Sequence, residues 1–375
     1  MRDKLAPEDF SDYVSQEQTI SVENVHMDDL LREVVERGAS DLHFSVGLPP
    51  ALRIDGRLVH MAYAPLTPNE IQRMVYDILS AEQIQWFEKT RELDFSYGAR
   101  GVGRFRVNVY RQRSSVGAAL RAIPDQIPSY EQLRLPPILG QLARRNSGLI
   151  LVTGPTGSGK STTIACMIDQ INSERELHIM TIEDPIEYLH RHKRAMVNQR
   201  ELNTDTDSFE NALRAVLRED PDVILVGEMR DLETIAAALT LAETGHLVFG
   251  SLHTRNAPQT ADRVIDVFPP HQQEQIRVQL SNTIEAIVAQ QLLPRTGGGR
   301  VVAVEILVAT SAVRNLIREG KTYQMHSVME TGAQFGMQSM DKTLADLHRS
   351  GQVGYQDAAS RSIDPENFQR FLQGG

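Results

Sequence analysis

The spacing of hydrophobic and polar positions changes near residue 147, and the change predicts two domains. Before that point, short strand-like runs are mixed with amphipathic helical segments, a pattern typical of an α+β domain. After it, continuous apolar runs alternate with helical segments. Such alternation predicts a mostly parallel sheet with helices on both faces. We therefore expect an α/β core that is preceded by a smaller α+β domain.

Several local signals define the smaller domain. Apolar residues between Leu30 and Val35 recur at helical spacing, and Gly38 is placed to end that helix. Thr67-Pro68-Asn-Glu70 marks a second helix start, and a third helical segment surrounds Trp86. Asp55-Gly56 is a tight hairpin signal between two strands. Strands are predicted at 41–45, 51–54, 57–61, 94–97, 103–110 and 117–121.

The boundaries follow from composition. Residues 1–23 are polar and acidic without sustained periodicity, and they predict a flexible tail or a short surface helix. The α+β domain is placed at 24–122. Residues 123–147 hold several prolines and predict a linker that becomes a short helix. The α/β domain with a helical C-terminal part is placed at 148–375.

Apolar strand runs of the second domain point to the place where chemistry is expected. In parallel sheets ligands bind beyond the carboxyl ends of the strands, and most of these runs end in polar clusters. Gly297-Gly-Gly299 is predicted to be a turn between a helix and a strand. The predicted strands are 149–152, 178–182, 223–226, 247–249 and 301–308.

A glycine-rich loop follows the first of these strands. It reads Gly154-Pro-Thr-Gly-Ser-Gly159-Lys160-Ser161 and precedes a helix, which is the context of a Walker A phosphate loop. Glycines allow backbone N–H groups to point at phosphate oxygens. Lys160 is expected to reach the β- and γ-phosphates of ATP, and the Ser161 hydroxyl to bind Mg²⁺. The predicted nucleotide-binding residues are Gly154, Thr156, Gly157, Ser158, Gly159, Lys160, Ser161 and Thr162.

An acidic cluster follows the second strand. Glu183, Asp184 and Glu187 would repel one another unless a cation or a water network held them. A solvated acidic turn is the simpler interpretation. Beside a phosphate loop, we favour a role near Mg²⁺ or the attacking water.

The third strand delivers a single carboxylate. Val223–Val226 is followed by Gly227 and Glu228, the pattern of a Walker B motif. Glu228 is the candidate that polarises the hydrolytic water and contacts Mg²⁺ through water. The alternative is an acidic cap on the strand, which the preceding apolar run disfavours.

The fourth strand is flanked by two histidines. His246 and His253 are seven residues apart, so a regular strand would place them on opposite faces. A break at Gly250-Ser251 would let both serve one site. We expect His253 near the γ-phosphate, and His246 in a supporting, packing or interface role.

Arginines form the last candidate group. Phosphoryl transfer needs cations from outside the phosphate loop. Arg104 and Arg106 lie on one predicted strand of the small domain, and Arg121 lies on the next. Arg214 and Arg218 are four residues apart in a predicted helix and would share a stripe. Taken singly, each of these arginines is an ordinary solvated surface charge.

Composition narrows the class of protein. A net charge of −10 argues against nucleic acid as a partner, although it allows a local basic channel. The single cysteine, Cys166, cannot form an internal disulfide or a four-cysteine zinc site, and its helical position suggests packing. Apolar stretches are shorter than a membrane span, and the N-terminus lacks a signal-peptide core. We expect a cytoplasmic protein.

Together the motifs resemble those of the secretion-superfamily ATPases. Their order matches Walker A, an Asp box at Thr181–Glu187, Walker B at Asp220–Glu228 and a His box at Gly245–His253. In addition, Ala312-Val-Arg-Asn-Leu-Ile-Arg-Glu-Gly-Lys321 is similar to a signature of PilT-type type IV pilus retraction ATPases. Other branches of the superfamily usually carry a four-cysteine zinc insert. The resemblance covers residues 25 to about 350.

This resemblance implies a homohexamer of subunits with a PAS-like N-terminal domain and a RecA-like C-terminal domain, with ATP and Mg²⁺ between them. It implies that Glu187 is the functional Asp-box carboxylate, Glu228 the catalytic base and His253 a γ-phosphate sensor. Arg106 and Arg121 correspond to arginines that close over the nucleotide. Leu316 and Ile317, in the signature, are expected to couple hydrolysis to motion.

The implied function is a motor that retracts type IV pili for twitching motility. It would be docked on the cytoplasmic face of the inner membrane, where it would act on a pilus platform protein. Alternatives are an accessory PilU-like retraction ATPase that works beside a paralogue, or a nucleotide-switched assembly or regulatory ring. A nucleic-acid translocase is disfavoured by the net charge.

Overall fold

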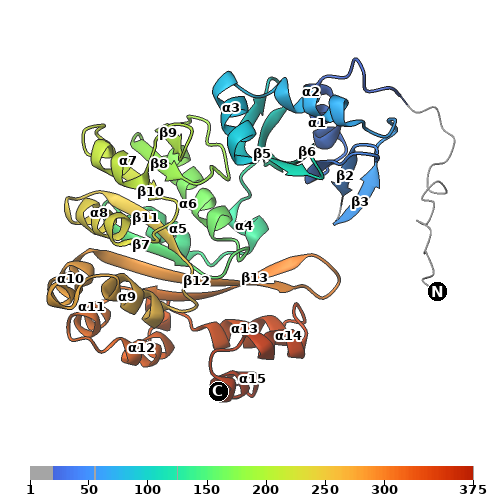
Figure 1. The fold of residues 1–375 in the computed structure, drawn as a ribbon. Coiled ribbons are helices and arrows are strands. Elements are labelled where there is room, and N and C mark those ends of the chain that lie inside the picture. Colours follow the sequence, from blue (N-terminus) through green and yellow to red (C-terminus); the bar gives the residue numbers. More distant parts are fainter. Residues whose placement is uncertain (1–19, 55, 125, 375) are drawn as a thin grey trace, which may run out of the picture. The chain divides into compact units, whose positions relative to one another are not determined.

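The computed structural model describes residues 20–54, 56–124 and 126–374. The chain folds into two compact units, Met1–Asp125 and Gln126–Gly375. In Figure 1 the first unit runs from blue to teal, and the second runs from green to red. None of the helices in the described ranges has the length and apolar content needed to cross a membrane.

The first unit is an antiparallel sheet with three helices. Its six strands pair in the order β3-β2-β1-β6-β5-β4. Side chains of α1 and α2 pack with the strands in one apolar core. The elements are α1 (Met27–Glu36), β1 (Asp41–Phe44), β2 (Ala51–Ile54), β3 (Arg57–His60), α2 (Pro68–Tyr76), α3 (Ala81–Thr90), β4 (Glu92–Ala99), β5 (Gly103–Gln112) and β6 (Ser115–Ile123).

Local sequence signals account for the helix ends of this unit. Thr67 caps α2 in a capping box, because the Glu70 carboxylate accepts its N–H at 2.7 Å while its own hydroxyl accepts the Glu70 N–H. Gly38 follows α1 with a φ of 62°, a left-handed conformation that glycine adopts without strain. Both predicted boundaries are confirmed.

The start of the first unit differs from expectation. Residues 1–19 of the predicted tail lie outside the described residues, but the folded part begins before residue 24. The Ile20 N–H donates to the Ala62 carbonyl at 3.1 Å, and the Val22 side chain is completely buried. The predicted turn at Asp55-Gly56 lies partly outside the described residues, and Gly56 has a φ of 80°.

The second unit is built on a seven-stranded sheet in the order β13-β12-β7-β11-β10-β8-β9. All neighbouring strands are parallel except β12 and β13. Its strands are β7 (Gly148–Thr153), β8 (His178–Glu183), β9 (Met196–Glu201), β10 (Val223–Val226), β11 (Leu247–Leu252), β12 (Ile284–Pro294) and β13 (Arg300–Val308). Its helices are α4 (Tyr130–Leu133), α5 (Ile138–Ala143), α6 (Lys160–Glu174), α7 (Phe209–Val216), α8 (Leu232–Glu243), α9 (Ala257–Asp266), α10 (Pro270–Thr283), α11 (Ser311–Arg318), α12 (Met325–Thr331), α13 (Met340–Arg349), α14 (Tyr355–Arg361) and α15 (Pro365–Leu372).

Strand β7 shows why this sheet is covered on both faces. All six of its residues are buried. Leu149 and Leu151 pack into a core with α8 and α9, whereas Ile150 and Val152 pack on the opposite face with α5 and α6. Successive side chains of a strand alternate between faces, so a continuous apolar run needs helices on each side. The predicted layers are confirmed.

Cys166 is buried on α6. It is 4% exposed, and burial raises the pKa of its thiol to about 12. The prediction of a packing role is confirmed.

Two segments differ from the sequence prediction. The region predicted as a linker contributes α4 and α5 to the second unit, where Leu139 and Leu142 are buried against α6 and β7. Strands β9 and β12 were not predicted. Because β12 pairs antiparallel with β13, Gly297–Gly299 is a hairpin turn between two strands, and the predicted turn between a helix and a strand is wrong.

Register brings the strand ends to one edge. Thr153 at the end of β7 is opposite Leu252 at the end of β11. Val226 on β10 is opposite Gly250 on one side and Ile182 on the other. The residues that follow these strands therefore meet at the carboxyl edge of the sheet, as predicted.

Candidate active site

The loop that follows β7 has the backbone of a phosphate loop. Gly154, Gly157 and Gly159 have φ values of 141°, 77° and 90°, in a region where side chains cause strain. Gly154 has a second constraint, because a Cβ atom there would lie 2.3 Å from the Gln290 carbonyl oxygen. The loop is thus packed directly against β12 and leads into α6 at Lys160.

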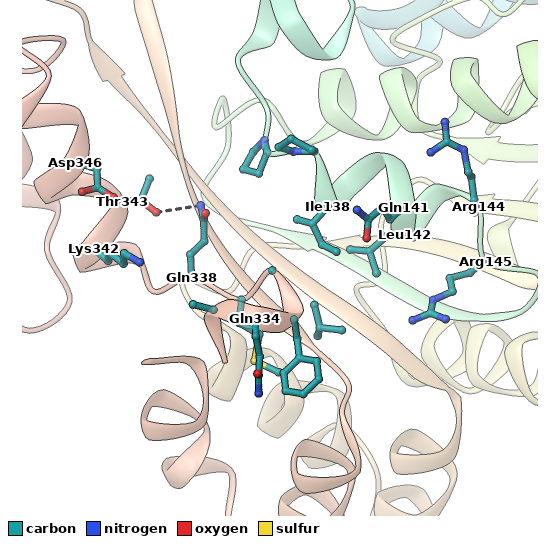
Figure 2. A pocket seen from close by; sticks show the side chains of 17 residues that line it. Ile138, Gln141, Leu142, Arg144, Arg145, Gln334, Gln338, Lys342, Thr343 and Asp346 are labelled. Carbon is teal, nitrogen blue, oxygen red and sulfur yellow. Dashed lines mark hydrogen bonds between the residues drawn. The ribbon is translucent and has the colours of Figure 1, made fainter. Parts of the chain in front are cut away.

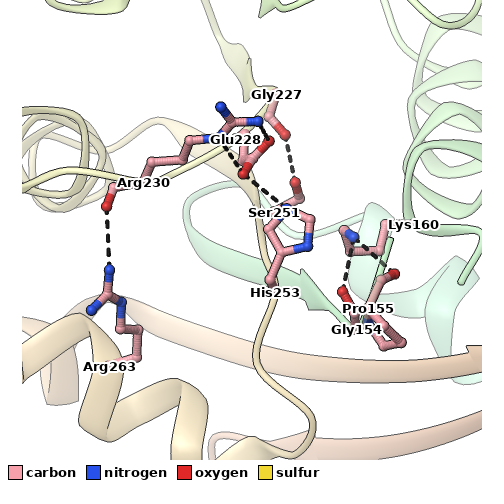
Figure 3. A network of polar contacts seen from close by, with 9 residues as sticks. All are labelled: Gly154, Pro155, Lys160, Gly227, Glu228, Arg230, Ser251, His253 and Arg263. Atoms are coloured by element: carbon pink, nitrogen blue, oxygen red, sulfur yellow. Dashed lines mark hydrogen bonds and ion pairs between the residues drawn. The ribbon is translucent and has the colours of Figure 1, made fainter. Parts of the chain in front are cut away.

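The side chain of Lys160 is hydrogen-bonded to this loop. Its Nζ donates to the carbonyls of Gly154 at 2.9 Å and Pro155 at 3.3 Å, and the residue is only 9% exposed (Figure 3). Burial lowers the pKa of Lys160, and the carboxylate of Glu228 partly opposes that shift. The ammonium group therefore sits at the loop with an acidic partner nearby.

Glu228 is the centre of a polar cluster at the end of β10. One of its oxygens is 2.8 Å from His253 Nε2, and both oxygens accept from the Arg230 guanidinium (Figure 3). Burial raises the pKa of Glu228, but Arg230 and His253 outweigh that effect, so the pKa lies below its usual value. Glu228 is consequently ionised at neutral pH.

Close packing explains the glycine before this carboxylate. A Cβ atom on Gly227 would lie 3.0 Å from the backbone of Glu183 on β8. The Gly227 carbonyl accepts the Ser251 hydroxyl at 2.5 Å from β11. Three neighbouring strands therefore fix the backbone from which Glu228 projects.

The acidic cluster after β8 is divided between interior and surface. Glu183 is buried and accepts from Thr181 Oγ1 at 2.7 Å and Gln199 Nε2 at 3.2 Å. Burial raises the pKa of Glu183 to about 7, although these hydrogen bonds oppose the shift. Asp184 and Glu187 are exposed. The functional role of Glu187 stays a prediction.

The two histidines lie at opposite ends of β11. This strand runs without a break through Gly250 and Ser251, so the break that would have let both histidines serve one site is not present. His253 nevertheless follows the strand directly and reaches Glu228. At the other end, His246 Nδ1 lies 2.9 Å from the Leu241 carbonyl, where it closes the turn after α8. A strand of six residues separates the two histidines by about 20 Å, so they serve different regions.

Small-domain arginines share one face of the first unit. Arg106 on β5 is directly opposite Arg121 on β6, so the two side chains lie on the same side of the sheet. Arg121 Nε donates to the Asp41 carboxylate at 2.8 Å. Arg104 is on the same strand as Arg106. The proposed contacts of these residues with nucleotide stay predictions.

The arginines of α7 do not form the predicted stripe. The helix ends at Val216, and Arg218 lies beyond it. Arg214 forms an ion pair with Glu210 on the preceding turn at 2.6 Å and is largely exposed.

Helix α11 carries the C-terminal signature, and its residues differ in how far they are buried. Ile317 is completely buried, and Leu316 packs partly against the same core. Arg314 also points inward: its guanidinium donates to Glu285 at 2.6 Å and to the Ser281 carbonyl at 2.9 Å. These residues hold α11 to the domain. A coupling role for Leu316 and Ile317 stays a prediction, and Ile317 also has a packing role.

A cavity of about 480 Å³ borders the phosphate loop. It is lined by Ser158 and Gly159 of the loop, by Leu133 at the end of α4, and by Leu292 of β12. The lining combines apolar side chains such as Leu292 with polar ones such as Gln290 and Arg300, a mixture that suits a nucleobase and ribose beside the phosphates. The sequence did not indicate these wall residues, because β12 was not predicted.

Tyr188 is a second residue that sequence reasoning missed. Its hydroxyl is 3.0 Å from Thr162 Oγ1 at the start of α6, and it lines the same cavity. Its carbonyl accepts from Gln199, which also binds Glu183. The segment after β8 is thereby tied to the phosphate loop helix.

A larger cavity of about 910 Å³ lies elsewhere, between α5, the 3₁₀ segment Ala333–Phe335 and α13 (Figure 2). Two arginines in its lining already have acidic partners, since Arg144 pairs with Glu174 and Arg145 with Glu285. It lacks a glycine-rich loop, so it does not fit the phosphates of a nucleotide.

Metal binding by protein groups alone is not supported in residues 20–54, 56–124 and 126–374, where no cluster of three acidic, histidine or cysteine ligands occurs. Ser161 is exposed in the first turn of α6. A single hydroxyl fits Mg²⁺ that is held mainly by nucleotide phosphates.

The comparisons with known proteins agree with this geometry. The family model for type II/IV secretion system proteins matches residues 15–298. The chain is 48% identical over 340 residues to the type IV pilus retraction ATPase PilT of Pseudomonas aeruginosa, covering 91% of this chain and 99% of that protein. It is 41% identical over 347 residues to the type IV pilus ATPase PilU of the same organism, covering 92% and 91%.

Solved structures show the same likeness. A crystal structure of the pilus retraction motor PilT with bound ADP has a TM-score of 0.87 and 52% identity, covering 92% of this chain and 99% of that one. The ATPase DotB of Legionella pneumophila has a TM-score of 0.80 and 27% identity, covering 91% and 98%.

Proposed function

The chain belongs to the type II/IV secretion system protein family, and on this premise we propose that it is a hexameric ATPase motor that retracts type IV pili. Two predictions are confirmed by the family and its relatives: the RecA-like core and the ATPase activity. The observation that carries the proposal is the cluster of Lys160, Glu228 and His253 at the carboxyl edge of the sheet.

Each residue of this cluster has a role in ATP hydrolysis. Glu228 is ionised and partly exposed, so it can accept a proton from the attacking water. Lys160 binds the β- and γ-phosphates, and His253 contacts the γ-phosphate through the imidazole that now touches Glu228. Mg²⁺, when bound through Ser161 and through a water on Glu228, would neutralise phosphate charge.

Arginines of the first unit complete the charge balance in this proposal. Arg106 and Arg121 lie on one face of the sheet and would contribute positive charge to the γ-phosphate when the two domains close on ATP. Asp41 already positions Arg121. Closing and release of these arginines would convert hydrolysis into domain rotation.

Retraction also needs partners. In this proposal, six copies form a ring at the cytoplasmic face of the inner membrane and act on the pilus platform protein. A paralogous retraction ATPase is a further partner. The exposed residues Asn315 and Arg318 of α11 are available for such contacts, whereas Ile317 is not.

The decisive test is retraction in cells that carry this chain as their only retraction ATPase. Individual labelled pili should shorten, and twitching should spread, in cells with the wild-type chain. The matched Glu228→Gln variant should be present at the same level without supporting retraction. Absence of retraction with the wild-type chain, despite measured ATP hydrolysis, would contradict the motor assignment.

An accessory motor is the second candidate, because the likeness to PilU spans 92% of the chain. The same cells separate the two candidates. Retraction only when a second retraction ATPase is co-expressed would support the accessory role.

A further inference from the structure

Arg230 binds the carboxylate of Glu228, the group that the proposed mechanism uses as its base. It lies in the short loop between β10 and α8, two residues after Glu228. Its Nε donates to one oxygen of Glu228 at 2.5 Å, and its Nη2 donates to the other at 2.6 Å. His253 Nε2 is 2.8 Å from the first oxygen (Figure 3). Glu228 is therefore engaged on both oxygens.

This engagement competes with the chemistry expected of Glu228. A carboxylate offers about four lone-pair sites, and three of them are used here. A general base must orient water and then take its proton, and it works less well when cations stabilise its charge. The arrangement thus keeps Glu228 ionised and in place, but reduces its ability to accept a proton.

We propose that Arg230 is a reversible clamp on Glu228 that has to open before ATP is hydrolysed, so that the free energy needed to open it lowers the rate of turnover. The proposal rests on the proposed function, because it takes Glu228 as the base of the ATPase. Arg230 is then a positioning residue: it acts on the reaction through Glu228.

The surroundings allow the clamp to open without disturbing the loop. The side chain of Arg230 is 68% exposed, whereas that of Glu228 is 20% exposed. The backbone at this point is held separately, since Arg263 donates to the Arg230 carbonyl at 3.4 Å and Asp231 caps α8 through the Thr234 N–H at 2.8 Å. The guanidinium can leave while the backbone stays.

An acceptor for the released guanidinium lies close by. Asp184, after β8, is near enough for its charge to raise the pKa of Arg230, an effect smaller than that of Glu228. Glu228 in turn acts on the pKa of Lys160, so the carboxylate that Arg230 releases lies near the phosphate loop.

The test compares steady-state ATP hydrolysis by the wild-type chain and Arg230→Gln. Losing an exposed ion pair should raise kcat about two- to fivefold. The KM should not change, and neither should the Kd for methylanthraniloyl-ATP, because Glu228 and the phosphate loop are intact. The matched control is Arg144→Gln, which removes a bidentate pair with Glu174 of the same kind and should leave kcat unchanged.

A structural role for Arg230 would give a different result. A kcat that equals or falls below the wild-type value, with unchanged Kd, would overturn the clamp. The double variant Glu228→Gln, Arg230→Gln should be inactive, and any elevated hydrolysis by it would also overturn the proposal. If Arg230→Gln does not fold, Arg230→Lys serves instead. One ammonium group cannot hold both oxygens, so kcat should rise by a smaller factor.

Failure of this inference differs from failure of the proposed function. A wild-type chain that does not hydrolyse ATP, or a Glu228→Gln variant with normal activity, removes the ATPase assignment of Glu228. A wild-type chain that hydrolyses ATP through Glu228, with no acceleration in Arg230→Gln, removes only the clamp.

Discussion

At the carboxyl edge of the seven-stranded sheet, Glu228 is bonded to Arg230 and His253. At the amino edge, Glu285 at the start of β12 is bonded to Arg314, which also binds backbone carbonyls. Both edges therefore have a partly buried carboxylate beside an arginine. They differ in what else the arginine binds: Arg314 also donates to main-chain carbonyls, whereas the Arg230 guanidinium donates to the Glu228 side chain.

This difference helps to distinguish charged residues with a catalytic role from charged residues with a structural role in a sheet protein. Backbone carbonyls cannot leave without unfolding a helix or strand end, so an arginine that binds them is fixed. Side-chain partners can exchange for a substrate at little cost. The role of a charged residue is thus better indicated by its partners than by its type.

Among the substitutions that test this comparison, Glu228→Gln should have the largest effect on kcat. Removing the proposed base should lower kcat about 10²- to 10⁴-fold, because the water no longer has a proton acceptor. ATP binding should persist, since the phosphate loop is unchanged. Steady-state hydrolysis and methylanthraniloyl-ATP titration measure the two quantities. Wild-type turnover in this variant would remove the distinction between the two edges.

The histidines offer a matched pair. His253→Ala should lower kcat about 10- to 100-fold by removing a contact at the γ-phosphate. His246→Ala, at the opposite end of β11, should leave kcat nearly unchanged and lower the free energy of unfolding by about 1 kcal/mol, because it loses the Leu241 carbonyl. Hydrolysis and urea unfolding of both variants check this; equal losses of kcat would contradict it.

At the amino edge, Arg314→Ala should act mainly on stability. Several charge-assisted hydrogen bonds are lost, and Glu285 keeps only its pair with Arg145, so the free energy of unfolding should fall by about 1–3 kcal/mol. The kcat per folded molecule should stay constant. The control is Asn315→Ala, an exposed neighbour on α11. Urea unfolding gives the measurement, and an unchanged midpoint would show that this edge is not held by Arg314.

The smallest effect concerns Glu183. Its pKa is raised from 4.5 to about 7, so between these values the folded chain retains a proton that the unfolded chain has released. The free energy of unfolding should therefore fall as pH rises from about 4.5 to 7. Glu305, also raised to about 7, adds the same trend.

Glu183→Gln removes one of these two contributions. The slope of unfolding free energy against pH in that window should become shallower, by about half if only the two groups contribute. Urea unfolding at a series of pH values measures it. A slope identical to that of the wild-type chain would contradict a buried, proton-retaining Glu183.

Much of the fold followed from the sequence because its signals were local. The loop at 154–161, the apolar strands and the capping box at Thr67 are each defined by a few consecutive residues. Strand β12 was missed because it follows α10 without a turn signal, and its apolar residues fit a helix as well as a strand. The cavity walls formed by β12 were missed with it.

In the site, the sequence did not predict which side chains point into the protein and which point into solvent. Sequence reasoning grouped Glu183 with Glu187, but strand geometry buries the first and exposes the second. Arg230 was overlooked because its contact with Glu228 depends on how the loop after β10 turns back. Such a turn is set by packing against neighbouring strands, which no short motif encodes.

The burial of Cys166 has a practical consequence for measuring motion. A thiol that is 4% exposed, with a pKa of about 12, is scarcely reactive toward maleimides at neutral pH. Cys166 should therefore not react with dyes that are used to label an introduced cysteine. Dyes attached to one cysteine introduced in each unit would report the distance between the two units through a cycle of ATP binding and hydrolysis by energy transfer.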